Sequence, residues 1–255
     1  MIKIMFCIAD IVGATGKESA MPYRPEHKTR TRARIVASAS RLFNRHGFDG
    51  VSIDRIMAEA GLTRGGFYAH FPTKEALYAE AVLHILGNNP AAEWDDFHVD
   101  FSAVGAQLSR QLVEAYLSRR HHESVDVSCP MITLSADVTR GGREVRGAFR
   151  TVLAAMSGAF AAGLDGAPAE IRSKSLALVA CVVGGMMLSR AVGDEALADE
   201  IRAAVRAHVL GTSGWDAVDY PGAGCALAAA AKLRSPGSRP AGPRRPSRPR
   251  RRGRP

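Results

Sequence analysis

The chain has 255 residues, of which 46% are hydrophobic and 23% charged, a composition typical of globular proteins and not of disordered ones. Its net charge of +9 is distributed unevenly, with +4 in residues 1–86, −5 in residues 87–231 and +10 in residues 232–255. The total charge therefore does not by itself indicate nucleic-acid binding, and the longest suitable uncharged run, 15 residues at Ser175–Ser189, is shorter than the roughly 20 that an integral membrane span needs.

The four cysteines lie far apart, at Cys7, Cys129, Cys181 and Cys225. No Cys-x-x-Cys spacing occurs, so the sequence predicts neither a metal site nor a disulfide framework. The first apolar run is short and is broken by Asp10, which does not fit a signal peptide. These observations predict a reduced, cytoplasmic protein without a metal or cofactor.

The two ends of the chain differ in composition from the middle. Residues 1–25 are predicted to be a disordered or non-native extension, because they begin without helix caps and a more typical start comes at Met21. Residues 212–255 are predicted to be a linker followed by a disordered basic tail. The part from residue 232 onward is rich in Pro and Arg and has no apolar face to bury.

Helical periodicity begins close to residue 26. Within residues 30–46 the side chains of Ile35, Ala39, Leu42 and Phe43 share one face at 3.6-residue spacing, which predicts an amphipathic helix. A segment containing Gly and Asp then ends this helix.

Three shorter helices are predicted between residues 52 and 86. Ser52 suits the N-cap of the first, Thr63 that of the second and Thr73 that of the third. Gly61 lies in the tight turn between the first two, at a position that requires left-handed backbone.

The rest of the chain up to residue 210 is also predicted to be helical. No β-rich alternating run occurs, so the predicted fold class is all-α. The later helices are expected at about residues 98–120, 130–140, 143–163, 168–191 and 194–210.

Residues 51–78, VSIDRIMAEAGLTRGGFYAHFPTKEALY, contain two short helices joined by a tight turn, which is a helix-turn-helix arrangement. From Ala39 to Tyr78 the sequence resembles the amino-terminal DNA-binding domain of the tetracycline-repressor (TetR/AcrR) family. The carboxy-terminal part resembles that family only in the number and length of its helices. The resemblance implies a three-helix DNA-binding domain at residues 26–86, followed by a larger helical effector-binding and dimerisation domain at residues 87–211.

The resemblance also implies that residues 63–69 form the recognition helix, which enters the major groove. Arg64 is its first exposed long side chain and can pair with guanine O6 and N7. Residues 24–74 carry 10 basic and 4 acidic side chains, a charge that favours attraction to phosphates. The DNA-contacting residues implied are Ser52, Thr63, Arg64, Gly65, Gly66, Tyr68, His70 and Lys74.

A purely structural interpretation exists for most of these positions. Ser52 and Thr63 would be helix caps, Tyr68 a core residue and His70 an ordinary surface histidine. The Gly65–Gly66 pair would then be a plain turn. The joint spacing of the set, and not any single member, favours DNA binding.

Two properties of the carboxy-terminal region are also implied by the resemblance. The apolar helices at about 168–210 would form a dimer interface, the alternative being a buried helix of a monomer. Aromatic and Met side chains would line a cavity for a mostly apolar effector, the alternative being ordinary core. The pocket candidates are Trp94, Phe97, Phe101, Met131, Met156, Phe160 and Met186.

The leading hypothesis is a ligand-responsive repressor that binds a near-palindromic operator as a dimer and is released by a small-molecule effector. The alternative is a sequence-independent nucleic-acid-binding protein that acts through the Arg-rich tail. An enzyme is not predicted, because no nucleophile–base pair, phosphate-binding loop or metal-ligand spacing is present.

Overall fold

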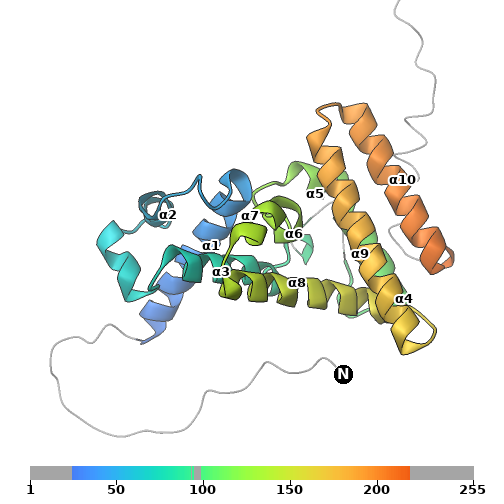
Figure 1. Ribbon diagram of the computed structural model, residues 1–255, viewed down its shortest axis with the longest axis horizontal. Coiled ribbons are helices and arrows are strands. Elements are labelled where there is room, and N and C mark those ends of the chain that lie inside the picture. Colours follow the sequence, from blue (N-terminus) through green and yellow to red (C-terminus); the bar gives the residue numbers. More distant parts are fainter. Residues whose placement is uncertain (1–24, 93, 95–98, 219–255) are drawn as a thin grey trace, which may run out of the picture. The chain divides into compact units, whose positions relative to one another are not determined.

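The computed structural model describes residues 25–92, 94 and 99–218 (Figure 1). Helices are the regular elements throughout this part of the chain, and none of its residues forms a strand, so the all-α prediction is confirmed. The extension before residue 25 and the basic tail lie outside the described residues.

The chain forms two compact units, each described separately here. Among the described residues, the head comprises 25–88 and 124–154, and the body comprises 89–92, 94, 99–123 and 155–218. Residues 124–154 thus pack with the amino-terminal part of the chain. The functional domain scheme expected from the sequence, with a boundary at residues 86 and 87, stays a proposal.

The head has a core of aromatic and aliphatic side chains around its first helix. Ile35, Ala39 and Phe43 are fully buried and Leu42 nearly so, which confirms the face predicted from periodicity. Phe67 from the third element is also fully buried. The elements are α1 Pro25–His46, α2 Ile53–Glu59, η1 Arg64–Ala69, α3 Lys74–Leu83, η2 His84–Leu86, α6 Pro130–Thr133, α7 Ser135–Arg140 and the first part of α8 Arg143–Ala161.

Two of the predicted N-caps in the head, and the predicted left-handed turn between its second and third helices, are confirmed. The Ser52 hydroxyl accepts a hydrogen bond from the Arg55 amide at 3.2 Å, and the Thr73 hydroxyl accepts one from the Ala76 amide at 3.1 Å. Gly61 has φ of +65°, which L side chains rarely adopt.

The end of α1 is fastened to the segment that precedes α6. The Asn44 amide donates to the carbonyls of Asp126 and Ser128, at 3.1 and 3.0 Å, and its oxygen accepts from the Thr133 hydroxyl at 2.7 Å. Asn44 is almost fully buried, so these bonds satisfy polar atoms that would otherwise be costly. The Asn44 side chain therefore joins α1 to residues that lie more than 80 positions later in the chain.

The turn after α1 is held in a similar way by α7. The Asp137 carboxylate accepts from the Phe48 amide at 2.8 Å with one oxygen and from Arg140 at 2.6 Å with the other. An added Cβ at Gly47, which has φ of +70°, would lie 2.8 Å from the same carboxylate. The turn between α1 and α2 thus depends on a residue of the later segment.

The body contains η3 Pro90–Ala92, α4 Gly105–Tyr116, α5 Arg119–Glu123, the end of α8, α9 Pro168–Ala191, α10 Glu195–Ser213 and η4 Trp215–Ala217. The predicted helix at 98–120 was wrong at its start. The Asp100 carboxylate accepts from the amide and hydroxyl of Ser102, at 2.9 and 2.6 Å, and this local turn competes with helix formation. A break after Tyr116 then separates α4 from α5.

Residues 211–218, predicted to belong to a linker, are anchored to the body instead. α10 continues to Ser213, and Gly214 ends it in the left-handed conformation with φ of +76°. Trp215 is then only 1% exposed, with its ring 5.5 Å from that of Phe160. The indole N–H donates to the Gly163 carbonyl at 2.7 Å.

α9 and α10 lie side by side (Figure 1) and make the most extensive helix pair of the body. An added Cβ at Gly185 would lie 2.8 Å from Val205, so the small residue permits this close approach. In the described part of the chain, α9 is the one helix that is long and apolar enough to cross a membrane. The apolar side chains of α9 also suit its packing against α10. Two of them, Met187 and Leu188, remain exposed.

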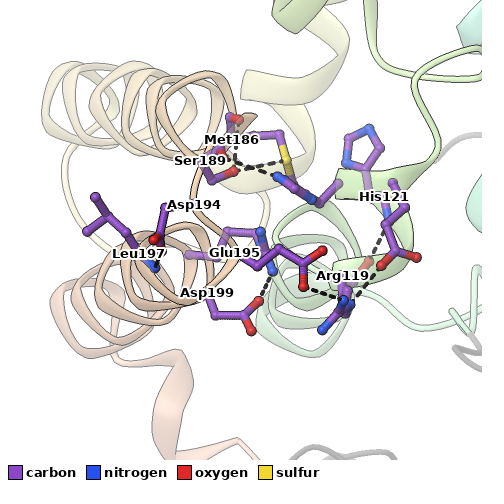
Figure 2. Close-up of polar contacts among 12 residues, drawn as sticks. Arg119, His121, Met186, Ser189, Asp194, Glu195, Leu197 and Asp199 are labelled. Carbon is purple, nitrogen blue, oxygen red and sulfur yellow. Dashed lines mark hydrogen bonds and ion pairs between the residues drawn. The ribbon is translucent and has the colours of Figure 1, made fainter. Parts of the chain in front are cut away.

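Polar side chains join α5 to α9 and α10 (Figure 2). Arg119 pairs with Glu123 at 2.7 Å and with Glu195 at 3.3 Å. Beside them, the His121 ring is nearly fully buried, and its Nδ1 bonds the Tyr116 carbonyl at 2.7 Å. Burial lowers the pKa of His121 to about 4, with a smaller contribution from the nearby Arg190.

Stability is expected to fall in mild acid because of His121. Its pKa of about 4 in the folded chain lies below the ordinary value of 6.5, so the unfolded chain takes up the proton first as pH decreases. The contribution is fully present above pH 6.5, and about 3 kcal/mol of it is lost by pH 4. Urea unfolding at pH 7, 5 and 4 measures this loss.

His121→Gln removes the titrating group and should reduce the pH dependence, whereas His208→Gln, at an exposed histidine of α10, should preserve it. Equal pH dependence in wild type and His121→Gln would contradict this assignment.

Candidate nucleic-acid interface

The predicted recognition helix is present as η1, a 3₁₀ helix instead of an α-helix. The Gly66 amide donates to the Thr63 carbonyl at 3.1 Å, and the His70 amide donates to the Phe67 carbonyl at 2.9 Å. Both bonds span three residues, which defines this tighter geometry. Gly65 and Gly66 each lower α-helix propensity by about 1 kcal/mol, so a short element with both does not favour α geometry.

One face of η1 is anchored in the head and the other is open. The fully buried Phe67 ring lies 5.9 Å from that of Phe71, which is also buried. Arg32 lies 4.4 Å above the Phe71 ring and forms an ion pair with Glu80. The inner face of η1 is therefore fixed by packing against the head, and Gly65 on its other face is exposed.

Arg64 and Tyr68 are the prominent side chains of the open face. The Arg64 side chain is 65% exposed, and its guanidinium donates to the Asp54 carboxylate of α2 at 2.7 Å. Tyr68 is 62% exposed, with its ring edge-on to Phe67. Exposure of this kind excludes the core alternative for Tyr68.

The two predicted hydroxyl contacts are both exposed but differ in their partners. Ser52 uses an oxygen lone pair to cap α2, and its proton remains available for an acceptor. Thr63 stands at the N-cap position of η1 without a side-chain capping bond. Helix capping therefore accounts for Ser52 and not for Thr63.

His70 is half-buried at the carboxy-terminal end of η1. Its buried Nδ1 has no hydrogen-bond partner within the described residues. Burial lowers the pKa of His70, and the neighbouring Lys28 and Arg32 lower it further. The ring is therefore neutral near pH 7 and sits beside two cations.

Lys74 also makes contacts within the head. Its ammonium donates to the Phe48 carbonyl at 2.6 Å and lies 4.1 Å from the centre of the Phe48 ring. Burial lowers the pKa of Lys74, while Asp49 and Glu75 raise it. An ammonium carries three protons, so a phosphate contact remains compatible with the bond to Phe48.

The pocket candidates of the sequence analysis are not all in one unit. Met131 is buried in the head, whereas Trp94, Phe160 and Met186 are buried in the body. Met156 is half-buried and Phe101 is largely exposed. Phe97 lies outside the described residues.

Sequence reasoning missed Asp54, the partner of Arg64. The two residues are ten positions apart and meet only because the turn at Gly61 folds η1 back against α2. Charge alone offered no signal for this pair. In the structure Asp54 holds the Arg64 guanidinium against α2.

Residues 35–81 match the model of the bacterial regulatory proteins of the tetR family. This segment of the chain is therefore similar to the DNA-binding part of the tetR-family regulators. TetR-family proteins are DNA-binding transcriptional regulators. Of the described residues, no group of three or more His, Cys, Asp or Glu side chains could hold a metal ion.

Two relatives named as HTH-type transcriptional regulators show how far the sequence similarity extends. The chain is 41% identical to the HTH-type regulator YerO of Bacillus subtilis over 54 residues, 21% of this chain and 19% of YerO. It is 27% identical to the HTH-type repressor AcnR of Corynebacterium glutamicum over 129 residues, 44% of this chain and 69% of AcnR. The strongest identity is thus confined to a short segment.

Solved structures of TetR regulators share the fold along more of the chain. The regulator from Cytophaga hutchinsonii has a TM-score of 0.57 and 17% identity, covering 76% of this chain and 98% of that one. The regulator from Legionella pneumophila has a TM-score of 0.57 and 20% identity, covering 71% and 95%. At these identities the likeness concerns the fold alone.

Proposed function

We propose that this TetR-family chain is a cytoplasmic repressor that binds a near-palindromic operator as a dimer. The observation that carries the proposal is the asymmetry of η1. Phe67 fixes its inner face, and Arg64 and Tyr68 project from the outer face within a segment of net charge +6. A rigid element with a bare Gly65–Gly66 backbone suits close approach to a groove, and Arg64 suits guanine.

The exposed side of α9 and α10 supports dimerisation. Met187, Leu188 and Leu197 are exposed apolar side chains. Gly184 has open space where a Cβ would stand, so a second helix could approach closely at this point. Such a face is costly in water and is stabilised when a second copy covers it.

The body is the proposed site of a small-molecule effector. A mostly apolar ligand would contact the buried or half-buried candidates Trp94, Met156, Phe160 and Met186. Release from DNA requires that this ligand favour the conformation with lower operator affinity.

Arg64→Ala is expected to weaken specific binding about 5- to 150-fold, because a bidentate Arg–guanine contact contributes about 1–3 kcal/mol of discrimination. The measurement is a gel-shift titration of the full chain on the DNA upstream of its gene, at physiological salt with excess competitor DNA. Wild-type binding with unchanged affinity in Arg64→Ala would contradict the proposed role.

Asp54→Asn is the matched variant at the other end of the same ion pair. It frees the Arg64 guanidinium and removes a negative charge from the surface, so the affinity for DNA should rise and not fall.

Deletion of residues 232–255 tests the alternative function. Loss of all DNA binding in that deletion, with no competitor-resistant complex in wild type, would favour sequence-independent binding through the tail.

A further inference from the structure

A pocket of about 200 Å³ lies within the head, bordered by the turn after α1, by α3 and by the segment that joins α7 to α8. Its lining includes none of the proposed DNA contacts and none of the effector-pocket candidates. An apolar cavity of about 150 Å³ is large enough to hold benzene. The volume therefore admits a molecule with one small ring or an equivalent aliphatic body.

Aromatic and aliphatic groups form one part of the lining. The rings of Phe48 and Tyr78 lie 4.9 Å apart at an interplanar angle of 45°. Tyr78 and Val145 are both buried, whereas Phe48 is half-buried. These surfaces suit an apolar body, and one of the rings, Phe48, already has the Lys74 ammonium 4.1 Å from its centre.

Carboxylates form another part of the lining. Both oxygens of Asp137 are engaged, by the Phe48 amide and by Arg140. Asp49 and Glu75 are exposed and are not within salt-bridge distance of a described cation, although both raise the pKa of the nearby Lys74 ammonium. With Lys74 and Arg140 included, the local charge is still −1 and disfavours an anionic ligand.

The Tyr78 hydroxyl gives a second, independent indication that the pocket binds a ligand. Tyr78 is 2% exposed, and its buried hydroxyl has no hydrogen-bond partner in the described part of the chain. Burial raises the pKa of this hydroxyl, as do Asp137 and Asp49, whereas Arg140 lowers it. The hydroxyl therefore stays protonated and lies among the charged groups of the pocket, where an unmet hydrogen bond is costly.

We propose that this pocket binds a small organic cation, a primary ammonium or amidinium on a body of about one ring. The cationic group pairs with Asp49 and Glu75, and the body packs against Phe48 and Tyr78. The Tyr78 hydroxyl accepts a hydrogen bond from the ligand N–H. The site is independent of the proposed effector site in the body and does not rest on operator binding.

Isothermal titration of the full chain with benzylamine and benzamidine tests the proposal, with benzyl alcohol and benzoate as neutral and anionic probes of the same size. We expect saturable binding of at least one cation with Kd on the order of 1 mM or tighter. The alcohol and the benzoate should bind at least tenfold more weakly. Absence of saturable binding by both cations, or equal affinity for all probes, overturns the proposal.

Substitutions in the pocket lining test whether the cation binds in this pocket. Asp49→Asn combined with Glu75→Gln should weaken the binding cation at least tenfold, and Tyr78→Phe should weaken it several-fold while keeping the ring. Glu26→Gln, at an exposed carboxylate in the first turn of α1, is the matched control and should leave the affinity unchanged. Circular dichroism confirms that each variant is folded. Unchanged affinity in the folded double variant overturns the assignment to this pocket.

Discussion

Replacing Trp215 with alanine is expected to lower the free energy of unfolding by about 3–5 kcal/mol, the usual cost of removing a buried tryptophan side chain. The indole is 1% exposed, packs on Phe160 and donates to the Gly163 carbonyl. Its removal leaves a cavity against Phe160 and an unpaired carbonyl at Gly163. Denaturant unfolding with a wild-type comparison measures the loss.

Two variants separate the contributions at this position. Trp215→Phe keeps aromatic packing but loses the donor, so its cost should be smaller than that of alanine. Asp216→Ala changes an exposed neighbour whose backbone carbonyl still accepts from Arg110, and it should alter stability by less than about 0.5 kcal/mol. Wild-type stability in Trp215→Ala would show that this segment is not an anchored part of the body.

Leu188→Asp is expected to dissociate the proposed dimer. Leu188 is 60% exposed on the face of α9 that we expect a second copy to cover. Burying an unpaired carboxylate there costs several kcal/mol, which corresponds to a rise in the dimer dissociation constant of at least about 100-fold. Sedimentation velocity across the micromolar range measures the shift from dimer to monomer.

Val104→Asp is the matched control, because Val104 is also an exposed aliphatic residue of the body but lies outside α9 and α10. It should leave the oligomeric state unchanged. A monomeric wild type at every concentration, or a Leu188→Asp dimer of wild-type affinity, would contradict the proposed interface. Leu188→Asp should also lose operator affinity although its η1 is intact. Arg64→Ala, in contrast, alters η1 itself.

The helical fold and the local signals in the head could be predicted because they depend on neighbours in sequence. The periodicity of Ile35, Ala39 and Phe43 identifies a buried face without knowledge of what covers it. Ser52 and Thr73 cap helices through residues only three positions away. The 3₁₀ geometry of η1 was not predicted, although its glycines weaken an α-helix.

Features that depend on distant residues could not be predicted in this way. Trp215 lies in a stretch rich in Gly and Asp, and the stretch is anchored by contacts with distant residues, the packing on Phe160 and the bonds to Gly163 and Arg110. The segment before α4 is also held by a later residue, because the Asp100 amide donates to the Gln111 side-chain oxygen at 2.6 Å. Similar limits apply to the interface, where Arg64 and Tyr68 followed from the motif but the ion pair with Asp54 did not.

The bonds made by Asn44 and Asp137 limit how this protein can be recombined with its relatives. A chimera that exchanges residues 26–86 alone would separate Asn44 from Asp126 and Ser128, and the Phe48 amide from Asp137. Each separation leaves a polar group of the transplanted segment without its native partner. A transplant of DNA specificity should therefore carry residues 124–140 together with the motif, or replace only the exposed side chains of η1.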